Sequence, residues 1–96
     1  MEVEFHPAAD EELSAAAAYY ESRRAQLGLE LTEEVEGVCT LISEYPEIGR
    51  KVDSRHRGIP LRRFPFVVFY RVQGSIIQIT AVAHKRKRPG YWRLRE

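Results

Sequence analysis

The sequence predicts an α+β domain in which a short N-terminal strand and an antiparallel helical hairpin pack on a small curved antiparallel sheet. Apolar residues recur with helical spacing over residues 8–27 and again as far as Pro46, which indicates two helices. Aromatic and β-branched residues dominate the sequence after Gly49, which indicates strands. The order strand, helix, helix and successive strands predicts that the hairpin covers one face of the sheet.

The helical half opens with a short predicted strand over residues 3–5, where apolar and polar side chains alternate. Pro7 suits the first position of a helix, and the apolar spacing predicts that this helix covers residues 8–27. Gly28 is expected to end it, because glycine adopts the left-handed conformation that closes many helices. A second helix then runs to Pro46, and its apolar stripe consists of Leu31, Val35, Val38, Leu41, Ile42 and Tyr45.

Small side chains in both helices predict close packing. Because the break at Gly28 is short, the two helices should form an antiparallel hairpin. The alanine run at residues 15–18 and Gly37 leave little side-chain bulk, so we expect them to let a neighbouring element approach closely.

Three strands are expected in the second half of the sequence, over residues 59–61, 64–72 and 75–84. The Gln-Gly pair at residues 73–74 predicts a tight turn, so the last two strands should be antiparallel neighbours. Pro65 cannot donate a hydrogen bond to a sheet, which places it at a strand start, a bulge or an edge.

The length of 96 residues predicts a single domain, residues 1–96, with one hydrophobic core. No apolar run reaches the ~18 residues that a membrane helix needs, and the first four residues lack the features of a signal peptide. The single cysteine, Cys39, cannot form an intramolecular disulfide, which suits a reducing compartment. We therefore expect a cytoplasmic protein without a membrane partner.

The charges are divided unevenly between the two halves of the chain. Residues 1–48 contain 2 basic and 12 acidic residues, a net charge of −10, and residues 49–96 contain 13 basic and 2 acidic residues, a net charge of +11. A surface formed by the second half should attract a polyanion or an acidic protein. The alternative is that the two halves neutralise each other where they pack.

The most informative segment, residues 84–93, follows the last predicted strand. Its basic side chains can bind phosphate, its aromatic rings can stack on bases, and its histidine can exchange a proton near neutral pH. This composition suits RNA contact or phosphodiester chemistry. A solvated basic tail, a docking site for an acidic partner and a chance match to a nuclear-import pattern are the alternatives.

The sequence predicts neither a cofactor nor a metal site. Its three histidines, His6, His56 and His84, are scattered, and Cys39 lies inside a predicted helix. No glycine cluster connects a strand to a helix, which excludes phosphate-binding loops and dinucleotide fingerprints.

A series of short motifs spans nearly the whole chain. In the first half they are VEFHPAA at 3–9, Glu12-Leu13, Tyr19-Tyr20 and Leu27-Gly28. In the second half they are Tyr45-Pro46, Gly49, LRRFPF at 61–66, FYRV at 69–72, AVAH at 81–84, Arg86, Pro89, Tyr91-Trp92 and Arg95. In their order and spacing, these motifs resemble the RelE/ParE superfamily of bacterial toxins, which includes many plasmid-stabilisation proteins.

This resemblance implies a type II toxin whose cognate protein antitoxin, ParD-like or RelB-like, wraps a largely helical segment over it. ParE-like members inhibit DNA gyrase, whereas RelE-like members cut messenger RNA in the ribosome. The motifs at 64–66 and 84–92 are closer to the ParE-like branch, and Val67 stands where RelE-like nucleases place a central arginine. Gyrase inhibition is therefore the first expectation. A metal-independent, ribosome-dependent mRNA interferase and a decayed toxin that only binds its antitoxin are the alternatives.

The resemblance also implies candidate site residues. For a nuclease, Arg86 and Tyr91 align with the family's catalytic positions, and His84 would act as acid or base, although a structural role at the strand end also fits it. The uneven charges and the small side chains at residues 15–18 predict that the antitoxin contacts the basic strands and the exposed part of the first helix, with Ala17 and Tyr20 as candidate residues. The candidate target-binding residues are Arg62, Arg63, Lys85, Lys87, Arg88 and Trp92, and Trp92 also suits a cap on the core edge.

Overall fold

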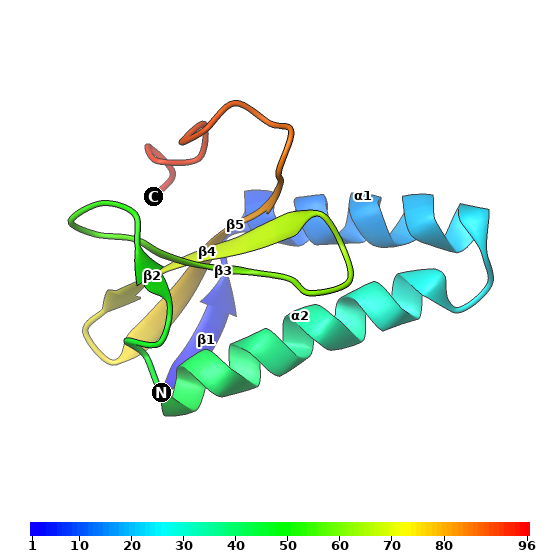
Figure 1. Ribbon diagram of the computed structural model, residues 1–96. Helices are drawn as coiled ribbons and strands as arrows, with labels where there is room; N and C mark the ends of the chain where they lie inside the picture. The colour runs from blue at the N-terminus through cyan, green and yellow to red at the C-terminus, as the bar shows by residue number, and fades with distance from the viewer.

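Two antiparallel helices cover one face of a five-stranded sheet in the computed structural model, which describes residues 1–96 (Figure 1). The helices are α1 (Pro7–Arg23) and α2 (Leu27–Glu44). The strands are β1 (Glu2–Phe5), β2 (Arg50–Lys51), β3 (Arg57–Pro60), β4 (Phe66–Gln73) and β5 (Ile76–His84). The order in the sheet is β1-β5-β4-β3-β2, which confirms the α+β class. Neither helix is long and apolar enough to cross a membrane.

The sheet is mixed, so the expectation of an entirely antiparallel sheet is wrong for one strand. β1 pairs in parallel with β5, whereas the other neighbours are antiparallel. The chain passes through both helices and three strands between β1 and β5, so no tight turn imposes antiparallel pairing on them. The predicted β4–β5 hairpin is confirmed: Gln73 pairs with Ile76, and Gly74 adopts φ 60° in the turn.

The edge of the sheet differs in detail from the sequence prediction. β2 was not predicted, because it has only two residues, both exposed and basic, and so lacks any apolar alternation. β3 ends at Pro60 rather than at Leu61, whose side chain is buried in the core. Pro65 lies directly before β4, where its missing N–H interrupts no strand pairing.

The break between the helices is not at Gly28, contrary to the prediction. α1 ends at Arg23, and Gln26 adopts the left-handed conformation with φ 75°. Gly28 lies inside α2, where a Cβ atom would come within 2.4 Å of the Ala17 carbonyl oxygen. It therefore permits close approach of the two helices. Gly37 does not, because a Cβ atom there would meet nothing within 4 Å.

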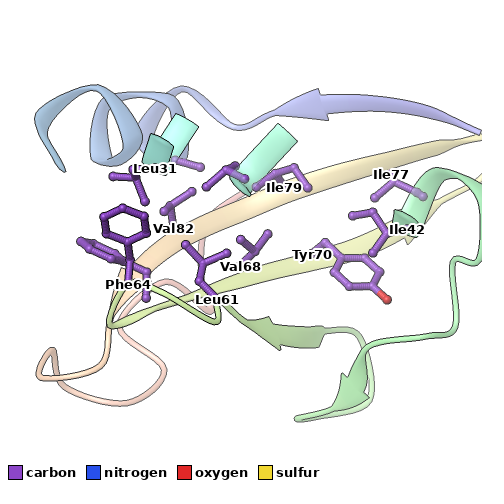
Figure 2. Close-up of a cluster of buried hydrophobic side chains, with 12 residues drawn as sticks. Leu31, Ile42, Leu61, Phe64, Val68, Tyr70, Ile77, Ile79 and Val82 are labelled. Atoms are coloured by element: carbon purple, nitrogen blue, oxygen red, sulfur yellow. The ribbon is translucent and has the colours of Figure 1, made fainter. Parts of the chain in front are cut away.

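The main core lies between the helices and the sheet, and Figure 2 shows its side chains pointing toward one another from α2, β4 and β5. Of the predicted stripe in α2, Leu31, Val35 and Ile42 are fully buried. Leu41 and Tyr45 are 38% and 59% exposed, so the prediction was wrong for these two residues. Leu41 is turned about 100° around the helix from Ile42, and Tyr45 lies beyond the last helical residue.

The opposite face of the sheet is covered by residues 85–96, which we call the C-terminal segment and which is orange to red in Figure 1. Ala81 and Ala83 of β5 form a small separate cluster with Trp92. A bulge interrupts the β4–β5 pairing, because Phe69 pairs with Ala81 and Tyr70 with Ile79. The extra residue, Thr80, is fully buried.

Candidate target-binding and antitoxin-binding surfaces

Glu12 holds the C-terminal segment to the rest of the molecule. Its carboxylate accepts hydrogen bonds from the Tyr91 hydroxyl at 2.5 Å and from Arg95 Nη1 and Nη2 at 3.0 and 2.9 Å. The main-chain N–H of Val82 donates to the same carboxylate at 3.0 Å. Arg95 also donates to the carbonyl oxygen of Thr80 at 3.0 Å. One side chain of α1 therefore joins this segment to β5.

These hydrogen bonds determine how the three side chains ionise. Burial alone would raise the pKa of the Glu12 carboxyl, but the hydrogen bonds from Arg95, Tyr91 and Val82 outweigh burial and lower this pKa. Burial, together with the contact to Glu12, raises the pKa of Tyr91 well above its usual value. The hydrogen bond to Glu12 also raises the pKa of Arg95. Tyr91 therefore keeps its proton at neutral pH and is poorly suited to act as a general base.

Trp92 fills the face of the sheet opposite the helices. Its side chain is only 2% exposed, and its ring stacks on Phe69 with the ring centres 4.2 Å apart. It also meets the His56 ring edge-on at 4.8 Å. His56 is fixed in turn, because its Nδ1 lies 3.1 Å from both carboxylate oxygens of Asp53, which also pairs with Arg93 at 3.2 Å. The Trp92 ring is therefore enclosed by the protein.

His84 and Arg86 lie together where β5 ends. The His84 ring is half-buried and meets the Phe66 ring edge-on at 5.0 Å. Its Nδ1 accepts a hydrogen bond from the main-chain N–H of Arg86 at 3.0 Å. The side chain of Arg86 is exposed and forms no ion pair.

Residues 85–88, which we call the basic turn, expose four consecutive cationic side chains directly after β5. None of them forms an ion pair, although the Lys87 ammonium lies 5.7 Å from the centre of the Tyr91 ring. The N–H of Lys85 donates to the carbonyl of Pro65 at 2.9 Å, which joins the β3–β4 loop to this turn. Arg62 on the same loop is also exposed and without an ion pair.

Arg63, by contrast, is engaged with α2. Its guanidinium pairs with Glu30 at 2.5 Å and lies 5.7 Å from the centre of the Phe64 ring. The hydrogen bonds from Arg63 and then Arg24 lower the pKa of Glu30. Of the two arginines expected to bind a target, the structure therefore leaves Arg62 free and ties Arg63 to a helix.

A small cavity of about 280 Å³ lies on the sheet face opposite the helices. Val67 is half-buried among its lining residues, at the position where the family resemblance would assign a nuclease an arginine. The apolar lining comes mainly from β4, β5 and the C-terminal segment, and the cationic lining residues are Lys85, Lys87, Arg88 and Arg93.

A larger hollow of about 520 Å³, which we call the α1 groove, lies between α1 and the end of the sheet near the basic turn. Its lining residues are Glu12, Ala15, Ala16, Tyr19, Tyr20, Phe66, Val82, His84, Lys87 and Tyr91. Tyr20 thus belongs to this groove, with its ring edge-on to Phe64 at 5.0 Å. Ala17 borders a different hollow, which it shares with Thr32 and Glu36 of α2.

Sequence reasoning missed the two carboxylates that bind the C-terminal segment. Glu12 follows Asp10 and Glu11 in the first turns of α1, where the helix dipole alone accounts for acidic residues. Its partner Tyr91 is 79 residues away, so no local pattern marks the contact. Asp53 carried a usable signal, because it is one of only 2 acidic residues in the basic half of the chain.

Comparison with known proteins agrees with the fold and the motifs. A family model described as the ParE toxin of type II toxin-antitoxin system, parDE, matches residues 3–89. A solved structure described as the chromosomal ParDE TA system from P. aeruginosa is similar with a TM-score of 0.65 and 21% identity, covering 88% of this chain and 95% of that chain, and shows the shared fold. No curated protein sequence matches. Because the family model covers most of its residues, the chain belongs to the ParE toxin family of type II toxin–antitoxin systems.

Proposed function

We propose that this chain is a cytoplasmic toxin that poisons DNA gyrase and is neutralised by a cognate ParD-like antitoxin. Membership of the ParE toxin family supports the toxin role. The observation that favours gyrase over messenger RNA is the internal use of the C-terminal aromatic residues. The Tyr91 hydroxyl is bound by Glu12, and the Trp92 ring is stacked on Phe69.

A nuclease centre would need groups that move protons and stabilise negative charge at the same phosphate. The Tyr91 hydroxyl already donates to Glu12 and so is not free to take a proton, and Val67 contributes no charge to the nearby cavity. His84 uses Nδ1 to accept a hydrogen bond from the backbone. Arg86 is the one candidate catalytic residue whose side chain has no internal partner, and His84 keeps Nε2 free, so the case against a nuclease rests on Tyr91 and Val67.

The test is to incubate the purified toxin with gyrase and plasmid DNA. We expect supercoiling to stop and gyrase-cleaved DNA to accumulate, and unchanged gyrase activity at high toxin excess would contradict the proposal. The same protein is then added to ribosomes carrying a message, where we expect no cleavage. Cleavage that Arg86→Ala abolishes and the control Arg55→Ala retains would establish the nuclease alternative instead. Normal growth when the toxin is expressed without its antitoxin would indicate a decayed toxin.

For the antitoxin, we propose that an amphipathic segment lies in the α1 groove. Small side chains of α1 and the rings of Tyr19, Tyr20 and Phe66 give the groove a largely apolar lining, which suits the apolar face of a helix. Ala15 lines this groove and is exposed, so its side chain is accessible to a partner. Ala17 faces a different hollow and is expected to contribute less than Tyr20.

Ala15→Trp places a large ring in the α1 groove and should weaken antitoxin binding by at least about tenfold, because a packed interface tolerates little added volume. The matched control is Ala25→Trp, at an exposed position between the helices and outside the groove. Isothermal titration calorimetry with the purified antitoxin measures both affinities. Equal affinities for the two variants would show that the antitoxin binds elsewhere.

A further inference from the structure

We propose that the basic turn, together with Arg62, binds the phosphate backbone of duplex DNA, so that the toxin contacts the DNA held by gyrase as well as the enzyme. This inference rests on the proposed function, because gyrase brings DNA to the toxin. It assigns the free cations to DNA and leaves the contact with gyrase to other surfaces.

The first reason is that these charges have no carboxylate partner inside the protein. The carboxylates near this part of the molecule are already engaged: Glu12 by Arg95 and Tyr91, and Asp53 by His56 and Arg93. Glu34 accepts hydrogen bonds from the main-chain N–H groups of Arg62 and Arg63 and pairs with neither side chain. Four consecutive cations in the basic turn are left exposed without an ion pair. Exposed cations without partners concentrate positive potential and attract a polyanion.

The second reason is geometric. The hydrogen bond from the Lys85 N–H to the Pro65 carbonyl fixes the start of the basic turn against the loop that carries Arg62. The hydrogen bond from the Arg86 N–H to His84 Nδ1 fixes the next residue against the end of β5. The main chain that carries these cations is therefore held in place, and only their long side chains need to be ordered on binding.

The third reason separates duplex DNA from single-stranded nucleic acid. Proteins that hold single strands without sequence preference stack bases on aromatic side chains. The aromatic residues of the C-terminal segment are not free for this: Trp92 is 2% exposed, and Tyr91 lies under the Lys87 ammonium with its hydroxyl bound to Glu12. What remains is a set of cations that contact phosphates, and such contacts require no access to the bases.

The test compares two triple variants that remove the same charge. K85A/R86A/R88A removes three cations of the basic turn and keeps Lys87, which contacts Tyr91. R50A/K51A/R55A removes three cations that are also exposed and unpaired but lie on β2 and the loop after it. Circular dichroism and thermal melting should show that both variants fold like the parent, because none of the removed side chains has a hydrogen-bonded or ion-pair partner.

Binding is measured by fluorescence anisotropy with a labelled duplex of about 20 base pairs at a series of salt concentrations. At about 50 mM salt we expect the basic-turn variant to bind at least about tenfold more weakly than the parent, and the slope of log K against log salt to become shallower by about 2 to 3. The control variant should lose less than about threefold. Equal losses in both variants, or no binding by the parent, would overturn the inference. Binding of a single strand more than about tenfold tighter than the duplex would also overturn it.

A second measurement separates this inference from the proposed function. Capture of gyrase on immobilised toxin without DNA should be the same for the parent and the basic-turn variant, whereas trapping of cleaved DNA should fall for the variant. If the variant lost capture of DNA-free gyrase and kept its duplex affinity, the cations would bind an acidic protein surface, and the inference would be wrong while gyrase poisoning stood. If the parent bound the duplex through the basic turn but left gyrase unaffected, the proposed function would fail and the DNA contact would stand.

Discussion

The helix face and the opposite face of the sheet are covered by different kinds of interaction. Twelve buried hydrophobic residues form the core on the helix face, where α2 contributes aliphatic side chains. On the opposite face, one buried tryptophan of the C-terminal segment packs on two alanines of β5, and a carboxylate of α1 binds that segment. The stability that comes from burying apolar area does not change with the ionisation of side chains. The attachment of the C-terminal segment through Glu12 does, because it requires a charged carboxylate. The two coverings should therefore respond to different perturbations.

The largest effect is expected from Trp92→Ala. Truncating a buried tryptophan removes its stack on Phe69 and should lower the free energy of unfolding by about 3–5 kcal/mol. Chemical denaturation measures the loss, and hydrogen exchange should show the amides of the C-terminal segment opening before those of α2. Leu94→Ala is the control, because Leu94 is 95% exposed. If the amides of α2 and of the C-terminal segment opened together, the two faces of the sheet would not be stabilised independently.

Glu12→Ala should lower the free energy of unfolding by about 2–3 kcal/mol, because it leaves the Tyr91 hydroxyl, the Arg95 guanidinium and the Val82 N–H without their acceptor. The side chains of Arg95 and Glu12 remain 19% and 21% exposed, so water relieves part of this loss. The neighbouring exposed residue supplies the control, Glu11→Ala, for which less than about 0.5 kcal/mol is expected. If Glu12→Ala and Glu11→Ala lowered the free energy of unfolding by similar amounts, the hydrogen bonds of Glu12 would not stabilise the fold.

On the helix face, Gly28→Ala should destabilise the protein by about 1–3 kcal/mol, because the added Cβ atom would press on the main chain of α1. Gly37→Ala in the same helix meets nothing and should instead stabilise the protein by about 0.5–1 kcal/mol. Both substitutions raise helix propensity, so the difference between the melting temperatures of the two variants reports the close packing at Gly28. Equal shifts in the same direction would contradict the close approach at Gly28.

The smallest effect is a change in pH dependence. Because the folded protein lowers the pKa of Glu12 below its usual value of 4.5, the ionised carboxylate stabilises the fold above that pH. This contribution is lost as the pH falls from 4.5 through the lowered folded pKa. Glu12→Gln should therefore lose less stability on acidification than the parent, in urea titrations between about pH 6 and pH 3. Part of the dependence should persist, because the pKa values of Asp53 and Glu30 are lowered too. Parallel pH profiles for the parent and variant would argue against ionisation of Glu12.

The sequence predicted those parts of the fold that local patterns encode. Helical spacing predicted both helices, and β-rich runs around Gly74 predicted the β4–β5 hairpin. It failed where a contact between distant residues decides the outcome. Gly28 looks like a helix end in isolation, and only the proximity of Ala17 shows its packing role. The same limit applies to the candidate site: the basic composition marked residues 84–93, but the partners of Tyr91 and Trp92 come from α1, β4 and the β2–β3 loop.

The hydrogen bond between Glu12 and Arg95 spans 83 positions of the chain, and this separation has a consequence for the order of folding. Contacts between distant residues form late, because the chain must first lose the entropy of closing a long loop. During synthesis, α1 leaves the ribosome long before its partner residues do. We therefore expect the helical hairpin and the β4–β5 hairpin, whose elements are neighbours in the sequence, to form before the C-terminal segment with its basic turn docks on Glu12. The α1 groove, which shares Glu12 and Tyr91 with that segment, is complete only after this final step.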